Sequence, residues 1–153
     1  MYRMFVRHNV RAAFAALSRG ELGTDDMAPD VRHSFPGAGA LGGRRDDRDD
    51  VEAWLVRLYR VLPGLSFDVH AVAVDGWPWN TTVGVQWSSH AELADGSHYR
   101  NDGAHILRLR NGRIIAFHAY VDDVAAIDNA LDRQAATGMT EAAAPQITSA
   151  ARA

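Results

Sequence analysis

The sequence predicts an α+β fold in which a curved antiparallel sheet wraps, as a cone, around N-terminal helices. Two observations lead to this prediction. Apolar residues recur at helical spacing up to residue 62, whereas residues 65–121 alternate with the period of two that is typical of strands. Because strands of this length twist, a meander of four is expected to curl. At 153 residues the chain suits a single domain that buries a substantial core.

The first helix is predicted from about Arg3 to Arg19. One apolar stripe begins at Val6 and includes Phe14, and Gly20 supplies a C-terminal cap. A short second helix is expected over Leu22–Ala28, since residues 24–26 offer capping side chains.

A short strand comes next, because apolar and polar residues alternate over Val31–Phe35 until Pro36-Gly37 stops the pattern. The glycine-rich segment Gly37–Gly43 then predicts a mobile loop at a rim. It lacks the Gly-Lys-Ser/Thr ending of a phosphate-binding loop, so an anion site is the less favoured interpretation.

Five acidic residues crowd positions 46–52, at the start of a third helix. The helix macrodipole favours carboxylates there, so we interpret them as capping residues and not as a metal site. Val51, Trp54, Leu58 and Tyr59 lie on the broad apolar face of this helix, which Pro63-Gly64 ends.

Residues 65–121 are predicted to form four strands in a meander. Asp95-Gly96 and Asn111-Gly112 are strong hairpin signals, and Gly76-Trp77-Pro78 makes a further break. A final helix is expected from Val124 to about Gln134. Residues 1–136 are therefore predicted to form one domain, and residues 137–153 an Ala-rich loose tail, with docking onto a neighbouring subunit as the alternative.

Composition excludes several classes of protein. The net charge is −3 and every basic residue is Arg, so we expect no nucleic-acid partner and no attraction to an acidic membrane. The chain contains no Cys, which excludes disulfides and thiolate metal sites. No apolar run approaches a membrane span, and the N-terminus lacks a secretory apolar core. We therefore predict a soluble cytoplasmic protein.

Three segments stand out within about Val6 to Leu131: Phe14-Ala-Ala-Leu-Ser-Arg-Gly-Glu-Leu, Asp30-Val-Arg-His-Ser-Phe-Pro-Gly and His105-Ile-Leu-Arg-Leu-Arg-Asn-Gly-Arg-Ile-Ile-Ala-Phe-His-Ala-Tyr-Val-Asp. Together with the order of elements, they carry a resemblance to the nuclear transport factor 2-like superfamily, specifically its SnoaL-like and ketosteroid-isomerase-like branch. It implies a homodimer and a cavity for small molecules. This superfold hosts many chemistries, so the resemblance identifies the fold better than the function.

The catalytic residues of two related groups have no match here. For ketosteroid isomerases, the Tyr position is Ala13, the oxyanion Asp position is His105, and the proton-moving Asp lies near Phe35. Steroid isomerisation is therefore not expected. The resemblance to limonene epoxide hydrolases places their Asp-Arg-Asp set at Gln86, Ser88 and Ala119, which argues against that apparatus.

SnoaL-like polyketide cyclases supply the best match. They place a His on the penultimate strand, matched by His105, and an acid/base Asp on the last strand, where this chain has Ala119. We expect His33 to be the nearest replacement for the missing carboxylate. The unperturbed pKa of imidazole, about 6.5, suits proton transfer near neutrality.

The sequence leaves open which face of each strand points into the pocket. The resemblance directs Gln86, Ser88 and His90 towards the pocket, whereas hydrophobicity alone favours Val83, Val85 and Trp87. The two patterns are compatible if the outer face of the sheet is apolar because it packs against a second subunit. In that case His118, Tyr120 and Trp87 belong to a dimer interface.

We therefore predict a cofactor-independent and metal-independent enzyme of the polyketide cyclase or isomerase type, acting on an apolar cyclic substrate. The catalytic residues would be His105 and His33. The predicted substrate-binding residues are Trp54, Tyr59, Gln86, Ser88, His90, Asn101, Phe117 and Ala119. The alternatives are a non-catalytic binding protein, an epoxide hydrolase-like enzyme with a rearranged site, or a scaffold with a filled cone in which His105 is a core residue.

Overall fold

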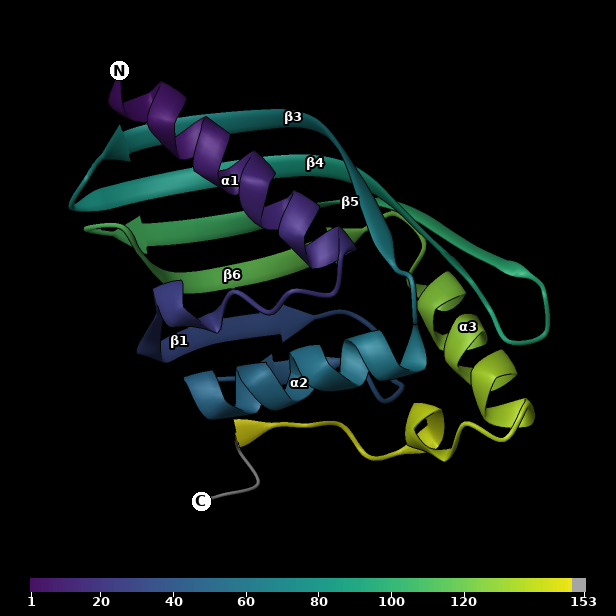
Figure 1. The fold of residues 1–153 in the computed structure, drawn as a ribbon. Helices are drawn as coiled ribbons and strands as arrows, with labels where there is room; N and C mark the ends of the chain where they lie inside the picture. The colour runs from purple at the N-terminus through teal and green to yellow at the C-terminus, as the bar shows by residue number, and fades with distance from the viewer. Residues whose placement is uncertain (150–153) are drawn as a thin grey trace.

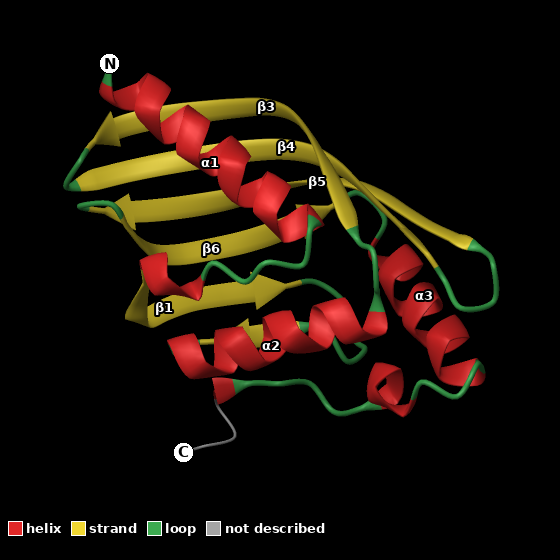
Figure 2. Ribbon diagram, viewed as in Figure 1, coloured by secondary structure: helices red, strands yellow, loops and turns green. Residues whose placement is uncertain are grey.

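One curved sheet of six strands covers two long helices in the computed structural model, which describes residues 1–149 (Figures 1 and 2). The helices are α1 (Tyr2–Ser18), α2 (Arg48–Val61) and α3 (Val124–Ala136), with 3-10 turns η1 (Thr24–Asp26) and η2 (Thr140–Ala143). The strands are β1 (Met27–Phe35), β2 (Gly43–Arg45), β3 (Ser66–Trp77), β4 (Asn80–Glu92), β5 (His98–Arg110) and β6 (Arg113–Val121). The α+β cone is confirmed.

The sheet is mixed, so the prediction of a wholly antiparallel sheet is wrong in one place. Its order is β2-β1-β6-β5-β4-β3, and the four-strand meander from β3 to β6 is antiparallel as predicted. Strand β1, however, pairs in parallel with β6. The alternation within a strand specifies its buried face but not the direction of its neighbour. The three-residue strand β2 was not predicted, because it is too short to show a pattern.

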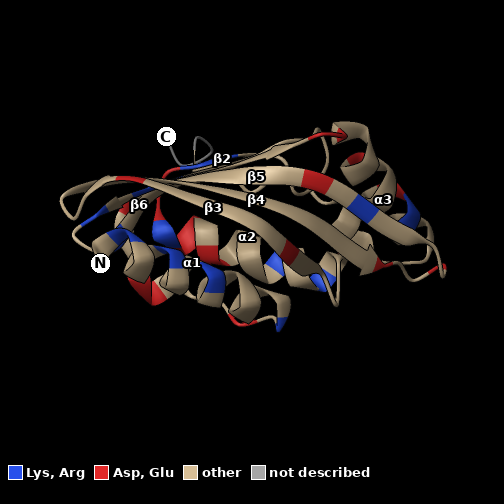
Figure 3. Cartoon of the chain, turned by 90° about the horizontal axis from the view of Figure 1, so that it is seen from above, with Lys and Arg blue, Asp and Glu red and all other residues tan. Residues whose placement is uncertain are grey.

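Helix α1 lies across the concave face of the sheet (Figure 3). Its apolar stripe buries Val6, Val10 and Phe14. On the outer side of the helix, Arg7 donates to the Val72 carbonyl at 3.2 Å, and Arg11 to a second carbonyl of β3 at 3.3 Å. These two bonds occupy backbone groups of β3, the last strand of the sheet, which would otherwise remain open at the edge.

Helix α2 forms the second support of the sheet. Asp47 caps it, accepting a hydrogen bond from the Asp50 amide at 2.8 Å, which confirms the capping interpretation of the acidic run. Val51, Trp54 and Leu58 are buried on its inner face. The broad apolar face predicted for this helix therefore packs into the core.

The glycine-rich loop is anchored, which contradicts the predicted mobile rim. The Asp128 carboxylate of α3 accepts from the amides of Ala38 and Gly39 at 3.1 and 3.0 Å. The Trp54 indole donates to the Leu41 carbonyl at 2.8 Å. Because a carboxylate of the chain itself occupies these amides, the loop offers them to no external anion.

Residues 137–149 are packed against the domain, so the predicted loose tail is wrong for this part of the chain. The Arg45 guanidinium donates to the Ile147 carbonyl at 2.7 Å, and the Ser149 hydroxyl donates to Asp50 at 2.7 Å. Arg57 donates to the Pro145 carbonyl at 2.6 Å. Residues 150–153 of that prediction lie outside the described residues.

Charge is distributed over the surface without a dominant sign in the view of Figure 3, where basic and acidic positions are interspersed. None of the helices within residues 1–149 combines the length and the apolar composition that crossing a bilayer requires.

We expect Arg57→Met to lower the free energy of unfolding by about 1–3 kcal/mol. Arg57 donates to the Ala40 carbonyl at 3.1 Å as well as to Pro145, and it pairs with Glu141 at 3.6 Å, so it joins α2, the glycine-rich loop and the C-terminal segment. Urea denaturation measures the loss, and limited proteolysis should show earlier cleavage within residues 137–149.

Arg60→Met is the matched control. Its side chain is 67% exposed and meets Glu141 only at 3.8 Å, so the change should cost no more than about 0.5 kcal/mol. Equal losses for the two variants would show that residues 137–149 are not held by Arg57.

Candidate functional site

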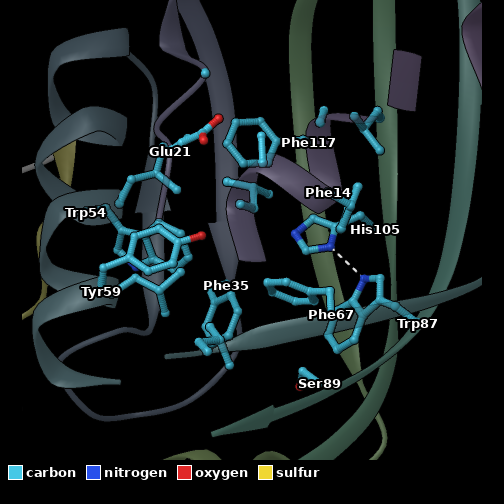
Figure 4. A pocket seen from close by; sticks show the side chains of 18 of the residues that line it. Phe14, Glu21, Phe35, Trp54, Tyr59, Phe67, Trp87, Ser89, His105 and Phe117 are labelled. Atoms are coloured by element: carbon cyan, nitrogen blue, oxygen red, sulfur yellow. Dashed lines mark hydrogen bonds between the residues drawn. The ribbon is translucent and has the colours of Figure 1, made fainter. Parts of the chain in front are cut away.

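An apolar cavity of about 430 Å³ lies between the concave face of the sheet and helices α1 and α2. Aromatic rings supply much of its wall: Phe14, Phe35, Trp54, Tyr59, Phe67, Trp87, Tyr99 and Phe117 (Figure 4). This space contradicts the filled scaffold considered above. An apolar cavity with few polar groups is the usual form of a small-molecule site.

Among the described residues, 1–149, His105 supplies the one imidazole of the cavity lining. It lies near the middle of β5, where alternation turns it to the same face as Leu107 and Leu109, and only 8% of the residue is exposed. The prediction that His105 faces an apolar cavity is confirmed.

The Trp87 indole determines how His105 can bond. Its Nε1–H donates to His105 Nδ1 at 2.8 Å. An indole nitrogen has no acceptor capacity, so Nδ1 must provide a lone pair, and the proton of the neutral imidazole must be on Nε2. Figure 4 shows Nε2 on the side of the ring away from Trp87 and towards the cavity. No residue within 1–149 makes a hydrogen bond to it that would compete with a ligand.

The imidazole is neutral at physiological pH. Burial, with a smaller contribution from the charge of His118, lowers the pKa of His105 to about 4. Protonation of Nδ1 would also oppose the indole hydrogen. His105 is therefore a neutral donor, and its cation is not available as a general acid near pH 7.

Aromatic neighbours fix this pair. Phe14 contacts His105 edge-on, with ring centroids 5.4 Å apart, and Phe67 contacts Trp87 in the same manner at 5.1 Å. Gly103 lies opposite Trp87 on β5, where a Cβ would come within 2.9 Å of the indole and 2.3 Å of the Tyr120 carbonyl oxygen. Only glycine leaves room for the indole at this position.

His33 is not in the cavity lining, which contradicts its predicted part as a proton carrier. The residue is fully buried, with its ring centroid 4.3 Å from those of both Trp54 and Phe117. Its Nδ1 accepts from Arg45 at 2.8 Å, since a guanidinium can only donate. Burial and then the Arg45 charge hold the pKa of His33 well below its usual value, as do His105 and His118 to a smaller extent.

Gln86, Ser88 and His90 were predicted to face the pocket, and this orientation is wrong. All three lie on the convex face of β4, where Gln86 and His90 are exposed. The apolar alternation of β4 prevails, so Val85 and Trp87 point inwards. Trp87 is 2% exposed, which also contradicts its predicted place in a dimer interface.

The convex side chains form their own contacts. The Ser88 hydroxyl donates to Asp102 at 2.5 Å and meets His70 Nε2 at 2.7 Å. The serine thus stands between the imidazole and the carboxylate, whereas in a catalytic triad the imidazole stands between them. His118 and Tyr120 do lie on this face, and a dimer interface there stays a prediction.

Asn101 and Ala119 share the inner face with His105 but are not in the cavity lining. The Asn101 amide is fully used, since it donates to the Asp123 carbonyl at 2.7 Å and accepts from the Asp123 amide at 3.1 Å. It therefore fixes the turn from β6 into α3. Ala119 pairs with His105 across the ladder and is buried.

Trp54, Tyr59 and Phe117 line the cavity as predicted. The Tyr59 hydroxyl is buried and has no hydrogen-bond partner within residues 1–149, and burial raises its pKa to about 12. It is a neutral phenol at any physiological pH.

Sequence reasoning missed the role of Trp87 as the hydrogen-bond partner of His105, and it missed two carboxylates that line the cavity. Glu21 and Asp26, from the segment between α1 and β1, are exposed residues that also line the cavity, so they mark its opening. Period-two alternation on β4 was the available signal for Trp87. No three His, Asp or Glu side chains gather as a metal site would require anywhere in residues 1–149.

A family model described as the SnoaL-like domain matches residues 7–117. The chain belongs to the SnoaL-like family. A search of curated proteins finds no match to this SnoaL-like chain.

Solved structures share the fold at low identity. Bal32a, from a soil-derived mobile gene cassette, is 20% identical with a TM-score of 0.69, covering 80% of this SnoaL-like chain and 93% of its own. IdmH from Streptomyces antibioticus, provisionally named a polyketide cyclase, is 17% identical with a TM-score of 0.64 over 82% and 97%. A Bacillus subtilis protein provisionally named an isomerase is 18% identical with a TM-score of 0.64 over 82% and 91%.

The protein should lose stability as the pH falls from about 6.5 to about 4. The pKa of folded His105 is about 4, below the unfolded value of about 6.5, so the unfolded state binds more protons in this window. The contribution of His105, up to about 3 kcal/mol, is complete above that window and is lost as the pH falls through it. His33 acts in the same direction.

Urea denaturation at pH 7 and pH 4.5 checks this expectation. His105→Gln should reduce the difference between the two pH values, whereas His98→Gln, at an exposed position of β5, should leave it unchanged. A wild-type His105 imidazole that titrates near pH 6.5 by NMR would contradict the burial argument.

Proposed function

We propose that this SnoaL-like protein is a small-molecule enzyme of the polyketide cyclase or isomerase type, which acts on an apolar cyclic substrate within the cone. The observation that carries the proposal is the open Nε2–H of His105 in an apolar cavity of about 430 Å³. The family and the two neighbours named for cyclase and isomerase chemistry support the same class of reaction.

His105 would act by stabilising negative charge. Its Nε2–H would donate to a substrate carbonyl oxygen, and this hydrogen bond strengthens when the oxygen gains charge as an enolate or alkoxide forms. The apolar wall excludes water, which increases the effect of a single fixed donor. His105 could in principle stabilise an oxyanion as a neutral donor or donate a proton as a cation, and its pKa of about 4 supports the first role.

The proton acceptor would be a carboxylate at the opening. Glu21 is the better candidate there, since it lines the cavity and the Arg19 guanidinium donates to its carboxylate at 2.9 Å, which holds that carboxylate in place. Glu21 thus replaces His33 in the proposed reaction. Isomerisation moves only protons, and cyclisation adds an enolate carbon to a carbonyl without an external oxidant or reductant, so neither reaction requires an organic cofactor.

A non-catalytic binding protein is the second candidate. Ala119 favours it, since this position holds the acid/base Asp of the cyclases that the chain resembles, and no carboxylate lies beside His105 in the cavity lining. Recovering a ligand that copurifies, and then finding it unaltered after incubation, would favour this candidate.

We expect the protein to catalyse exchange of the protons next to the carbonyl of a cyclic ketone in D₂O. With 1-tetralone and 2-tetralone as probes, His105→Leu should reduce the exchange rate by about 10²–10³-fold, because it removes an oxyanion donor. His105→Gln, which retains an N–H, should lose less. Deuterium incorporation followed by mass spectrometry measures these rates.

His90→Leu is the control, since His90 lies on the convex face and should leave exchange unchanged. Exchange that is catalysed by the wild type but insensitive to His105→Leu would contradict the proposed mechanism. Binding of a tetralone with no catalysed exchange would favour the binding protein.

A further inference from the structure

We propose that Trp87 is a positioning residue that fixes the tautomer of His105, so that the imidazole can only donate a hydrogen bond to a ligand. Trp87 would thereby select ligands that carry an acceptor oxygen, such as a ketone or quinone. The selection of ligands rests on the proposed function of the cavity, whereas the fixed tautomer does not. Trp87 acts through His105 and need not touch the polar end of the ligand.

Imidazole normally has a choice of tautomer. A neutral histidine can carry its proton on either nitrogen, so one ring can offer a ligand a donor or an acceptor. A carbonyl or hydroxyl partner for Nδ1 would permit Nδ1–H. The indole at 2.8 Å does not, because it supplies a hydrogen and accepts none.

Packing makes the Trp87–His105 pair rigid. Trp87 is 2% exposed, and its ring meets Phe67 on one side while Gly103 leaves the space that its outer edge occupies. The His105 ring is held edge-on by Phe14. Neither ring can turn over without displacing these neighbours, so the donor remains aimed into the cavity.

A fixed donor limits which ligands fit. A ligand amine or ammonium at this position would meet Nε2–H with another hydrogen and stay unpaired. A carboxylate would be buried without a cation, because the part of the lining formed by residues 1–149 contains no Arg or Lys. A neutral carbonyl oxygen satisfies the donor and needs no counter-charge, so ketones and quinones fit best.

A competing explanation treats the bond as a way of satisfying two buried polar groups, with no effect on ligands. The two explanations differ in the result expected when the indole N–H is removed. If Trp87 selects ligands, the preference for an acceptor oxygen should fall together with the fixed tautomer.

The test replaces the donor while keeping the ring. Trp87→Phe removes the N–H, and replacing the Trp87 indole by benzothiophene, through incorporation of benzothienylalanine, removes it with almost no change of shape. The second variant keeps the test decisive if Trp87→Phe folds poorly. Trp79→Phe is the matched control, since it makes the same change at a tryptophan that is 63% exposed and lies outside the cavity lining formed by residues 1–149.

Two readouts are measured on each protein. In ¹⁵N-histidine spectra of the ligand-free wild type at pH 7, His105 should show an unprotonated Nδ1 and a protonated Nε2, and both Trp87 variants should show a mixture of tautomers. Equilibrium dialysis with 1-tetralone and tetralin, which differ in one oxygen, gives the preference for an acceptor. That preference should fall about 2–10-fold in the Trp87 variants and stay constant in Trp79→Phe.

The outcomes separate this inference from the proposed function. A fixed tautomer and a Trp87-dependent preference for tetralone support it even if no proton exchange is catalysed. A wild-type His105 protonated on Nδ1, or a preference that survives in both Trp87 variants, would overturn it.

Discussion

The chemistry of the cavity depends on one hydrogen bond between neighbouring strands, from the Trp87 indole to His105. It forms because β4 and β5 pair in a register that sets Trp87 beside Gly103, two positions from the imidazole. The curvature of the sheet then turns both rings towards α1, where Phe14 closes over His105. Register, glycine and aromatic packing thus combine to direct His105 Nε2 into an apolar space.

The supports of this arrangement lie far from it in the sequence. Arg45 is fully buried, its guanidinium lies 5.2 Å from the centre of the Trp54 ring, and it bonds both His33 and the carbonyl of Ile147. The C-terminal segment therefore reaches the wall of the cavity through a single side chain. His33, which looked like a catalytic group from its position on β1, is better understood as the acceptor that helps satisfy this buried cation.

Local pattern predicted the elements well and the site only in part. Alternation on β4 and β5 correctly turned Trp87 and His105 inwards, while the family resemblance, displaced by one residue on β4, turned Gln86 and Ser88 inwards instead. A shift of one residue exchanges the two faces of a strand, so a small error in alignment reverses a whole set of assignments. The parallel pairing of β1 with β6 leaves no comparable local signal, because it joins residues that are distant in the chain.

In water, a neutral N–H stabilises a substrate oxyanion less than a cation does. Inside this cavity the neutral N–H has the advantage, because a buried cation is costly. Burial of a cation, with a smaller contribution from His118, is why the pKa of His105 falls to about 4. Charging the ring at Nδ1 would in addition break the bond from Trp87. A neutral N–H avoids both costs and still gains strength as a substrate oxygen becomes negative. In the proposed reaction, the fold would therefore stabilise the anion without holding a charge before the substrate arrives. This favours substrates whose own structure already disperses part of the negative charge, since a single neutral donor must stabilise the remainder.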